Sequence, residues 1–208
     1  MKIEMLVSAL AAALPCAAKG DTRYYLNGVY IEHRAGGCVR VVATDGHVLV
    51  SVADNTDTKQ PTIEPFILPR SVVEWALKNS KAGQRVTITV EDKRATVATA
   101  TGGSTTVDLV DGKYPDWCSV IPMGVLSGVD AHFGTEAMGK VVSVGVALKK
   151  FGAANKKGAC LKMIGNGETN SSVFRWTDLS ENMVVGGVVM PWRGSTEVDR
   201  GNITASLR

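Results

Sequence analysis

The residues with the clearest potential for chemistry are Asp45 and His47, which stand two apart in the polar segment 44-TDGH-47. A carboxylate beside an imidazole can serve as general base and acid, but catalysis also needs a nucleophile, a metal or a third orienting group. An Asp-x-His at a tight turn is more often a corner whose polar groups bond one another. We therefore expect a protein that is not an enzyme, and we set aside a small hydrolase built on Asp45 and His47.

The other reactive side chains argue against metal, redox and nucleotide chemistry. The four cysteines are widely spaced without a CxxC pair, which indicates free thiols in a reducing cytoplasm rather than disulfides or a zinc site: Cys16, Cys38, Cys118 and Cys160. The chain contains no GxxxxGK[ST] phosphate loop. A net charge of +3 over 208 residues is mild, so nucleic-acid binding would depend on where the basic residues lie. We expect no cofactor and no metal.

The polar turn must be positioned by a meander of half-buried strands. Residues 29–34 and 38–44 alternate apolar and polar side chains, and the glycine-rich segment 35–37 is short enough to join them as a hairpin. A further apolar run begins at Val48. The segment before this meander carries an apolar residue every four positions and reads as an amphipathic helix that Pro15 should end: Leu6, Leu10 and Leu14.

The same order of elements, a short strand, a helix and three strands, is expected three times. In the second copy we expect a strand at 66–68, a helix at 71–80 and strands at 85–91, 95–101 and 104–110. In the third copy, after a glycine-rich connector, we expect a strand at 131–133, a helix at 135–151 and strands at 159–164, 172–177 and 183–190. This internal repeat of about sixty to seventy residues is the main organisational feature of the chain.

The N-terminal segment has a lysine, an apolar run and small residues, as a secretory signal has. Glu4 lies where such a signal needs positive charge, so we expect a helix of the folded domain instead. No apolar run approaches the ~20 residues of a transmembrane helix. We expect a cytoplasmic protein without a membrane partner.

Three stretches resemble one family, in the order in which that family carries them. RYYLNGVYIE with VRVVATDGHVL (23–32 and 39–49) and DGKYPDWCSVIP (111–122) resemble the second domain of the bacterial sliding clamp, the processivity subunit of the replicative polymerase. GVVMPWR (187–193) resembles the C-terminus of that clamp. A lone ATDGH would be a weak signal, but three ordered motifs are specific.

The resemblance implies an α+β protein with the DNA-clamp fold. Each repeat would be a βαβββ unit, with the sheets outside and the helices lining a ring. Residues 1–122 would form one complete clamp domain of two units, residues 123–193 a half domain of one unit, and residues 194–208 a C-terminal tail.

The resemblance also implies a hydrophobic pocket that accepts a short linear peptide from a DNA polymerase or from a clamp loader. Apolar walls and a flexible methionine suit the leucine and phenylalanine anchors of such a peptide. Val48 and Ser119 stand where the family usually has arginine, which predicts fewer acidic contacts. By matching motifs, the expected lining is Leu26, Thr44, Gly46, His47, Val48, Leu49, Pro115, Val120, Val188, Val189, Met190, Pro191, Trp192 and Arg193.

In the family, basic residues on the helices that face the hole bind duplex DNA non-specifically, through phosphates. Here the resemblance implies contacts from Arg70, Lys78, Lys81, Lys140, Lys149 and Lys150. At about 100° per residue the first three fall on one helix face. The first helix is nearly free of basic residues, which departs from the family and predicts patchy charge.

A clamp ring contains twelve such repeats, so three per chain predict a homotetramer. Because successive repeats alternate in direction, an unpaired third repeat should meet another third repeat across a two-fold axis, which gives dihedral symmetry. We therefore expect a compact sliding clamp from a phage or mobile element. The alternative is a clamp-like decoy that binds the clamp-binding peptides of host replication proteins without encircling DNA.

Overall fold

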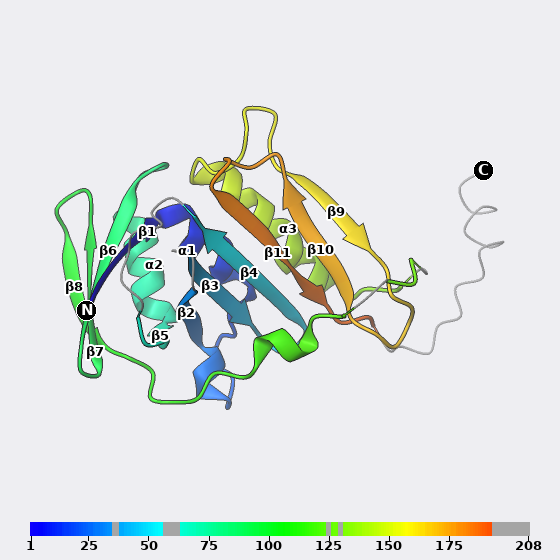
Figure 1. The fold of residues 1–208 in the computed structure, drawn as a ribbon, viewed down its shortest axis with the longest axis horizontal. Coiled ribbons are helices and arrows are strands. Elements are labelled where there is room, and N and C mark those ends of the chain that lie inside the picture. The colour runs from blue at the N-terminus through cyan, green and yellow to red at the C-terminus, as the bar shows by residue number, and fades with distance from the viewer. Residues whose placement is uncertain (35–37, 56–62, 124–125, 129–130, 193–208) are drawn as a thin grey trace.

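The fold is described by a computed structural model that covers residues 1–34, 38–55, 63–123, 126–128 and 131–192. Its strands form two antiparallel sheets (Figure 1). The smaller sheet has the order β1 (Lys2–Leu6), β6 (Arg85–Glu91), β7 (Arg94–Thr99) and β8 (Ser104–Asp108). The larger sheet has the order β5 (Phe66–Pro69), β2 (Gly28–Arg34), β3 (Cys38–Thr44), β4 (Val48–Asp54), β11 (Met183–Val189), β10 (Ser172–Thr177) and β9 (Cys160–Ile164).

The first two repeats exchange their first strands. β1 completes the sheet of the second repeat by pairing with β6, with Leu6 opposite Arg85. β5 completes the sheet of the first repeat by pairing with β2, with Pro69 opposite Gly28. In both cases the last residue before the helix lies opposite the first residue of the strand after the sister helix. Neither repeat is complete without the other.

The third repeat joins the first through its last strand. β11 pairs with β4 in antiparallel register from Met183 opposite Asp54 to Val189 opposite Val48. Gly187 is required in this pairing, because a Cβ at that position would overlap the Leu49 carbonyl oxygen. The sheet of the first repeat therefore continues without a break into the third.

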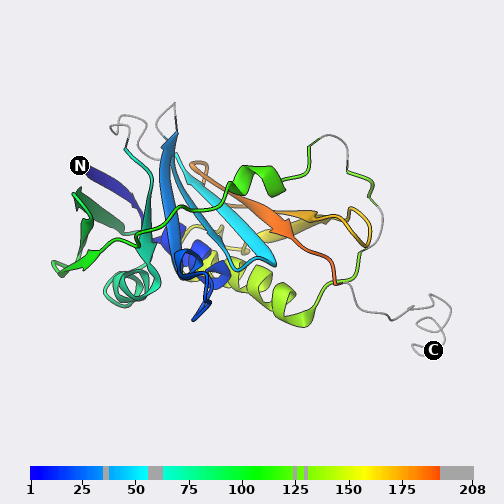
Figure 2. The same ribbon diagram turned by 90° about the horizontal axis from the view of Figure 1, so that it is seen from below.

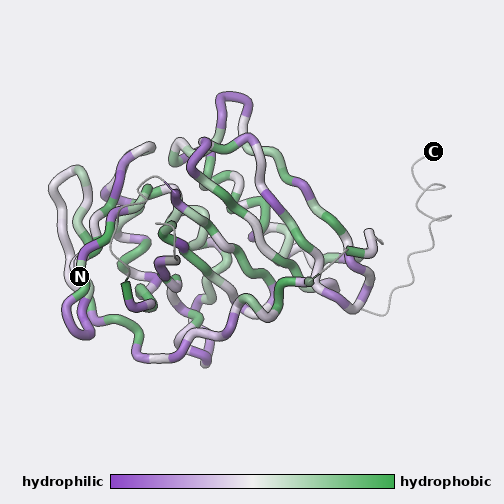
Figure 3. The backbone as a smooth tube through the Cα atoms, in the orientation of Figure 1, coloured by the Kyte–Doolittle hydropathy of each residue, from purple (hydrophilic) through white to green (hydrophobic). Residues whose placement is uncertain are grey.

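Three helices form a layer on one face of the larger sheet (Figure 2). α1 (Val7–Ala13) is buried along its whole length and contacts both α2 (Arg70–Lys78) and α3 (Thr135–Lys150). The helix predicted before Pro15 is confirmed, and the chain continues from it into the 3-10 helix η1 (Leu14–Cys16). Burial of α1 explains its lack of charged residues. Figure 3 shows the hydrophobic residues concentrated in these helices and the central strands.

The strand predicted at 131–133 is wrong. These residues lead directly into α3, as β1 leads into α1 and β5 into α2, but they pair with no strand among the described residues. Their one backbone hydrogen bond to the C-terminal segment runs from the Trp192 N–H to the His132 carbonyl, at 2.6 Å. The reason lies in the exchange described above: a first strand needs the sheet of a sister repeat, and the described residues contain no sister for the third repeat.

Candidate functional site

The 44-TDGH-47 turn between β3 and β4 is a closed polar corner. The Asp45 carboxylate accepts hydrogen bonds from the backbone N–H groups of His47, at 2.8 Å, and Val48, at 2.9 Å. The Thr44 hydroxyl accepts another from the Gly46 N–H at 3.0 Å. Gly46 adopts a φ of 95°, a left-handed conformation that favours glycine. The Asp45 carboxylate is thus occupied in shaping the turn, and His47 contributes its backbone N–H to it while its side chain is exposed.

Asp45 also ties the turn to the third repeat, because its other oxygen accepts a hydrogen bond from the Lys140 ammonium of α3. Burial raises the pKa of Asp45, but the hydrogen bonds from Lys140, Val48 and His47 outweigh it and hold the pKa below its ordinary value. Burial lowers the pKa of Lys140, and its bonds to Asp45 and Glu136 outweigh this and raise it. Both groups are therefore charged at neutral pH and stabilise the junction.

A pocket of about 510 Å³ lies next to this turn, where β4 begins and β11 ends. We call it the end pocket, and its lining is Gly46, His47, Met190, Pro191 and Trp192. The Met190 N–H donates to the His47 carbonyl at 2.8 Å, which holds the two walls together. Trp192 is 59% exposed and lies over Gly134, so a large aromatic surface stands open beside a half-buried methionine. All five residues belong to the lining expected from the motifs.

Three other expected lining residues lie on the outer face of the larger sheet, the face opposite the helices, beneath residues 111–122, which we call the cover. Leu26, Leu49 and Val188 are 2%, 4% and 3% exposed and form a cluster with Tyr114 and Trp117. This cover is the segment that carries the 3-10 helix η3 (Trp117–Val120), which Figure 2 shows on the side of the sheet opposite the helices.

The cover is anchored to the third repeat by the Ser171 hydroxyl, which donates to the Val120 carbonyl at 3.1 Å. On the cover itself, Pro115 and Val120 are exposed. Thr44 is 9% exposed at the corner.

Val48 and Val189 face the other side of the sheet. They lie opposite each other in the β4–β11 pairing and are 1% and 0% exposed in the core beneath the helices. Side chains alternate along a strand, so neighbours of Leu49 and Val188 must point away from the outer face. Arg193 lies outside the described residues.

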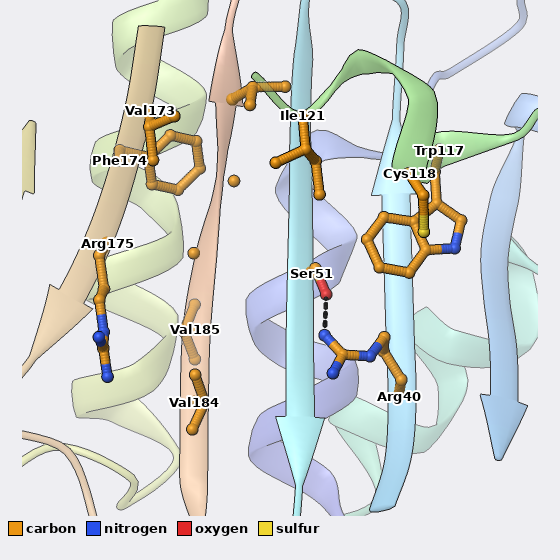
Figure 4. A pocket seen from close by; sticks show the side chains of 13 residues that line it. Arg40, Ser51, Trp117, Cys118, Ile121, Val173, Phe174, Arg175, Val184 and Val185 are labelled. Atoms are coloured by element: carbon orange, nitrogen blue, oxygen red, sulfur yellow. Dashed lines mark hydrogen bonds between the residues drawn. The ribbon is translucent and has the colours of Figure 1, made fainter. Parts of the chain in front are cut away.

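A second hollow of about 440 Å³ extends along the outer face over the same junction, and we call it the outer groove (Figure 4). Its lining is Arg40, Ser51, Trp117, Cys118, Ile121, Val173, Phe174, Arg175, Val184, Val185, Gly186, Gly187 and Val188. Arg40 donates to the Ser51 hydroxyl at 2.8 Å, and its guanidinium lies 5.6 Å from the centre of the Trp117 ring. The floor is apolar and the edges carry arginine.

Of the residues in the outer groove, only Val188 was expected from the sequence. Alternation could have found those that β10 and β11 present to the outer face: positions 173 and 175 of β10 share a face with positions 184, 186 and 188 of β11. That pattern places both strands beside the 111–122 segment only once the β4–β11 pairing is known.

The basic residues expected to contact DNA divide into two groups. Arg70 donates to the Leu14 carbonyl at 3.1 Å and the Ala17 carbonyl at 2.9 Å, and it pairs with Glu74. It therefore closes the end of η1, and Lys140 is likewise held in its ion pairs.

The remaining four are exposed: Lys78, Lys81, Lys149 and Lys150. The hydrogen bond from the Gly83 N–H to the Phe151 carbonyl, at 3.1 Å, brings the ends of α2 and α3 together, so these four lysines gather at one end of the helix layer.

Residues 1–34, 38–55, 63–123, 126–128 and 131–192 hold no group of three or more His, Cys, Asp or Glu side chains placed to bind a metal ion. They also hold no helix that is both long and apolar enough to cross a membrane.

Comparison with known proteins gives the chain its family. A profile described as the DNA polymerase III beta subunit, central domain, matches residues 2–116, more than half of the chain. The beta sliding clamp of Pseudomonas aeruginosa is 34% identical over 125 residues, 59% of this chain and 32% of that protein. That of Salmonella typhimurium is 36% identical over 108 residues, 50% and 28% respectively. The chain thus spans about a third of the length of the curated relatives it matches.

Solved structures extend the likeness of the fold into the third repeat. The P. aeruginosa DNA polymerase sliding clamp with ligand has a TM-score of 0.69 at 21% identity and covers 93% of this chain and 66% of its own. The beta subunit from Thermotoga maritima has a TM-score of 0.63 at 17% identity, covering 94% and 66%. The interlocked repeats, the helix layer and the profile match agree, and the chain belongs to the DNA polymerase III beta subunit family.

Proposed function

We propose that this chain is a shortened sliding clamp, which encircles duplex DNA and tethers a polymerase through a short linear peptide. The observation that carries the proposal is the end pocket. It forms between the turn of the family's central domain and the C-terminal strand, two parts far apart in sequence that β4–β11 pairing brings together. A chain that keeps both walls and the strand pairing between them retains what a peptide site needs.

The peptide suited to this site is short, apolar and aromatic. An aromatic anchor would stack on Trp192 and pack against Met190 in the end pocket, and an aliphatic anchor would lie in the outer groove against Val188. With Val48 turned into the core and Ser119 on the cover, neither position offers the positive charge that an acidic peptide residue would need.

DNA would be held by the four exposed lysines at the end of α2 and α3, through phosphates and without reading bases. Four chains would close the ring, with residues 1–122 as a complete domain and 123–193 as a half domain in each. Such a protein would work in the cytoplasm, where a replicating phage or mobile element has its DNA.

The second candidate is a decoy that captures clamp-binding peptides without encircling DNA. The observation that favours it is the loss of basic surface: α1 is buried, and Arg70 and Lys140 are held in internal bonds. A weakly charged helix layer would bind DNA poorly, so that peptide capture would be the protein's main activity.

The test combines peptide binding with retention on DNA. A fluorescent peptide carrying leucine and phenylalanine anchors is titrated against the native chain and against Met190→Ala, with the exposed Met123→Ala as the matched control. We expect Met190→Ala to weaken binding about tenfold or more and Met123→Ala to leave it unchanged.

Retention is then measured on closed circular and linearised DNA. Retention on circles alone supports the clamp, and peptide binding without retention supports the decoy. Peptide binding that is absent, or that is equal in Met190→Ala and the native chain, overturns both.

A further inference from the structure

The outer edge of the third repeat is an exposed and apolar strand. β9 pairs only with β10 among the described residues, so its other backbone edge is open. Its sequence, CLKMI, carries Leu161, Met163 and Ile164, and the last is 36% exposed. By contrast, β8 at one edge of the smaller sheet is polar and reads STTVD. Proteins normally blunt free edges with charge or cover them, and β9 carries a single charged residue, Lys162, among three large apolar side chains. This edge is therefore a candidate for pairing with another strand.

The helix next to this edge is apolar on its outer side as well. Val142 and Val146 of α3 lie one turn apart and are 51% and 61% exposed. A hollow of about 790 Å³ lies between α3 and the start of β9, lined among others by Val142, Leu161 and Trp176. An open strand edge and an exposed helix stripe thus meet at one end of the molecule.

The first two repeats show how such an edge is covered. The strand before one helix adds to the first strand after the sister helix, with Leu6 opposite Arg85 and Pro69 opposite Gly28. The first helical N–H then donates to the carbonyl just before that strand: Val7 to Gln84 at 2.9 Å, and Arg70 to Asn27 at 3.1 Å. Two independent exchanges follow one rule.

The third repeat carries both halves of this exchange, and among the described residues neither half is paired in this way. Residues 131–134 stand where β1 and β5 stand, immediately before a helix, and β9 stands where β6 and β2 stand, immediately after one. One chain cannot bring its own two halves together, because in the exchange each first strand serves the other repeat. A second copy supplies both at once.

We propose that two copies of this chain pair through their third repeats about a two-fold axis, each adding residues 131–134 to the β9 edge of the other. Applied to the third repeat, the rule puts Gly134 opposite Cys160, Phe133 opposite Leu161, His132 opposite Lys162 and Ala131 opposite Met163 of the second copy. The Thr135 N–H would donate to the Ala159 carbonyl across the interface. Val142 and Val146 would then pack against the same residues of the other α3. The inference rests on the proposed function only in treating the third repeat as half of a domain.

A second copy fits this surface better than a foreign peptide. A peptide on β9 would cover the edge but leave residues 131–134 unpaired, whereas the isologous contact satisfies both and needs no other sequence.

The register is tested by disulfide formation in a background of Cys118→Ser and Cys160→Ser, which removes the two exposed cysteines. His132 and Lys162 are both exposed, and directly opposed residues of antiparallel strands lie close enough for a disulfide. We expect His132→Cys mixed with Lys162→Cys, each on a separate chain, to give a covalent dimer under mild oxidation. Neither variant alone should do so. A failure of the mixed sample to crosslink, or equal crosslinking of either variant alone, overturns the register.

The contact itself is tested by the mass of the native chain in solution, by light scattering over a range of concentrations. We expect twice the chain mass of 22.0 kDa, or a multiple of that dimer. Val142→Glu combined with Val146→Glu should reduce the mass by half or more, whereas Met123→Glu, at a side chain that is 94% exposed, should not. A native monomer overturns the pairing.

The peptide titration of the proposed function is run on the same samples. Because the end pocket holds neither valine, a native monomer that still binds peptide refutes the pairing and leaves the tether standing. A dimer that binds no peptide supports the pairing and refutes the peptide tether.

Discussion

The packing of α3 in the third repeat can be measured by replacing each of two glycines of that helix with alanine and comparing the stability of the two variants. Gly139 is exposed, and a Cβ there would meet nothing within 4 Å. Gly145 is buried, and a Cβ there would overlap the Trp176 ring of β10, whose Cζ2 and Cζ3 atoms would both lie 2.7 Å away. Alanine is favoured over glycine inside a helix by about 1 kcal/mol, and this gain applies to both positions.

Gly139→Ala should therefore raise the free energy of unfolding, whereas Gly145→Ala should leave it unchanged or lower it. Carbon atoms in contact prefer about 3.5–4.0 Å, so Gly145→Ala must push the Trp176 ring back by roughly 1 Å. Overpacking of this kind costs about 1–3 kcal/mol. Subtracting the Gly139→Ala result from the Gly145→Ala result removes the helix-propensity gain and leaves this overlap, so the difference should be about 1–3 kcal/mol.

The free energy of unfolding is measured by urea denaturation, with thermal unfolding as a second readout. For a chain of this size each kcal/mol shifts Tm by about 2–4 °C. Gly139→Ala should raise Tm and Gly145→Ala should leave it unchanged or lower it. Equal shifts in the two variants would refute the packing of Trp176 against α3.

Three further outcomes are expected. Asp45→Asn should lower stability by about 1–3 kcal/mol at neutral pH, because it weakens charged hydrogen bonds at the corner. The pKa of Asp45 in the folded protein lies below its unfolded value of about 3.9, so the stability that Asp45 contributes is complete above about pH 3.9 and is lost as the pH falls further. In urea denaturation curves, the difference in free energy of unfolding between the native chain and Asp45→Asn should therefore narrow below about pH 4. A difference that stays constant with pH would contradict the ion pair. Gly187→Ala should lower the free energy of local unfolding of the third repeat by about 3 kcal/mol or more, which would be measured as faster hydrogen exchange in β9 to β11. Native-like exchange in these strands would be evidence against the β4–β11 register. Lys149→Gln with Lys150→Gln should flatten the dependence of log K for DNA on log salt by about 2 in slope, while an unchanged slope would exclude these lysines from the DNA surface.

The sequence predicted most of the local structure, because strands and amphipathic helices leave a period in the chain. The strand at 131–133 failed for a reason that no local pattern contains: its alternation is adequate, but its partner sheet is missing. The expected lining failed at Val48 and Val189 for a different reason. Motif matching transferred them with their neighbours, although alternation alone would have turned them away from Leu49 and Val188.

The basic residues show a second limit of sequence reasoning. The spacing of Arg70, Lys78 and Lys81 on one helix face was a sound expectation, yet Arg70 is occupied by the Leu14 and Ala17 carbonyls. Lys140 is occupied by Asp45, which lies ninety-five positions away in the chain. A helical wheel predicts the direction in which a side chain points from its helix, but it does not predict which group of another element that side chain will bind.

The enclosed position of α1 makes that helix a spacer. It lies between α2 and α3 and against the larger sheet, and Ala9, Ala12 and Ala13 are all 0% exposed. Methyl groups let the flanking helices approach closely, and any larger side chain there would push α2 and α3 apart and change how the three repeats are placed relative to one another. In a closed assembly, the bend of each chain fixes how many chains complete the circle. The circumference would then be set by the volume of a few alanines that touch neither water nor nucleic acid.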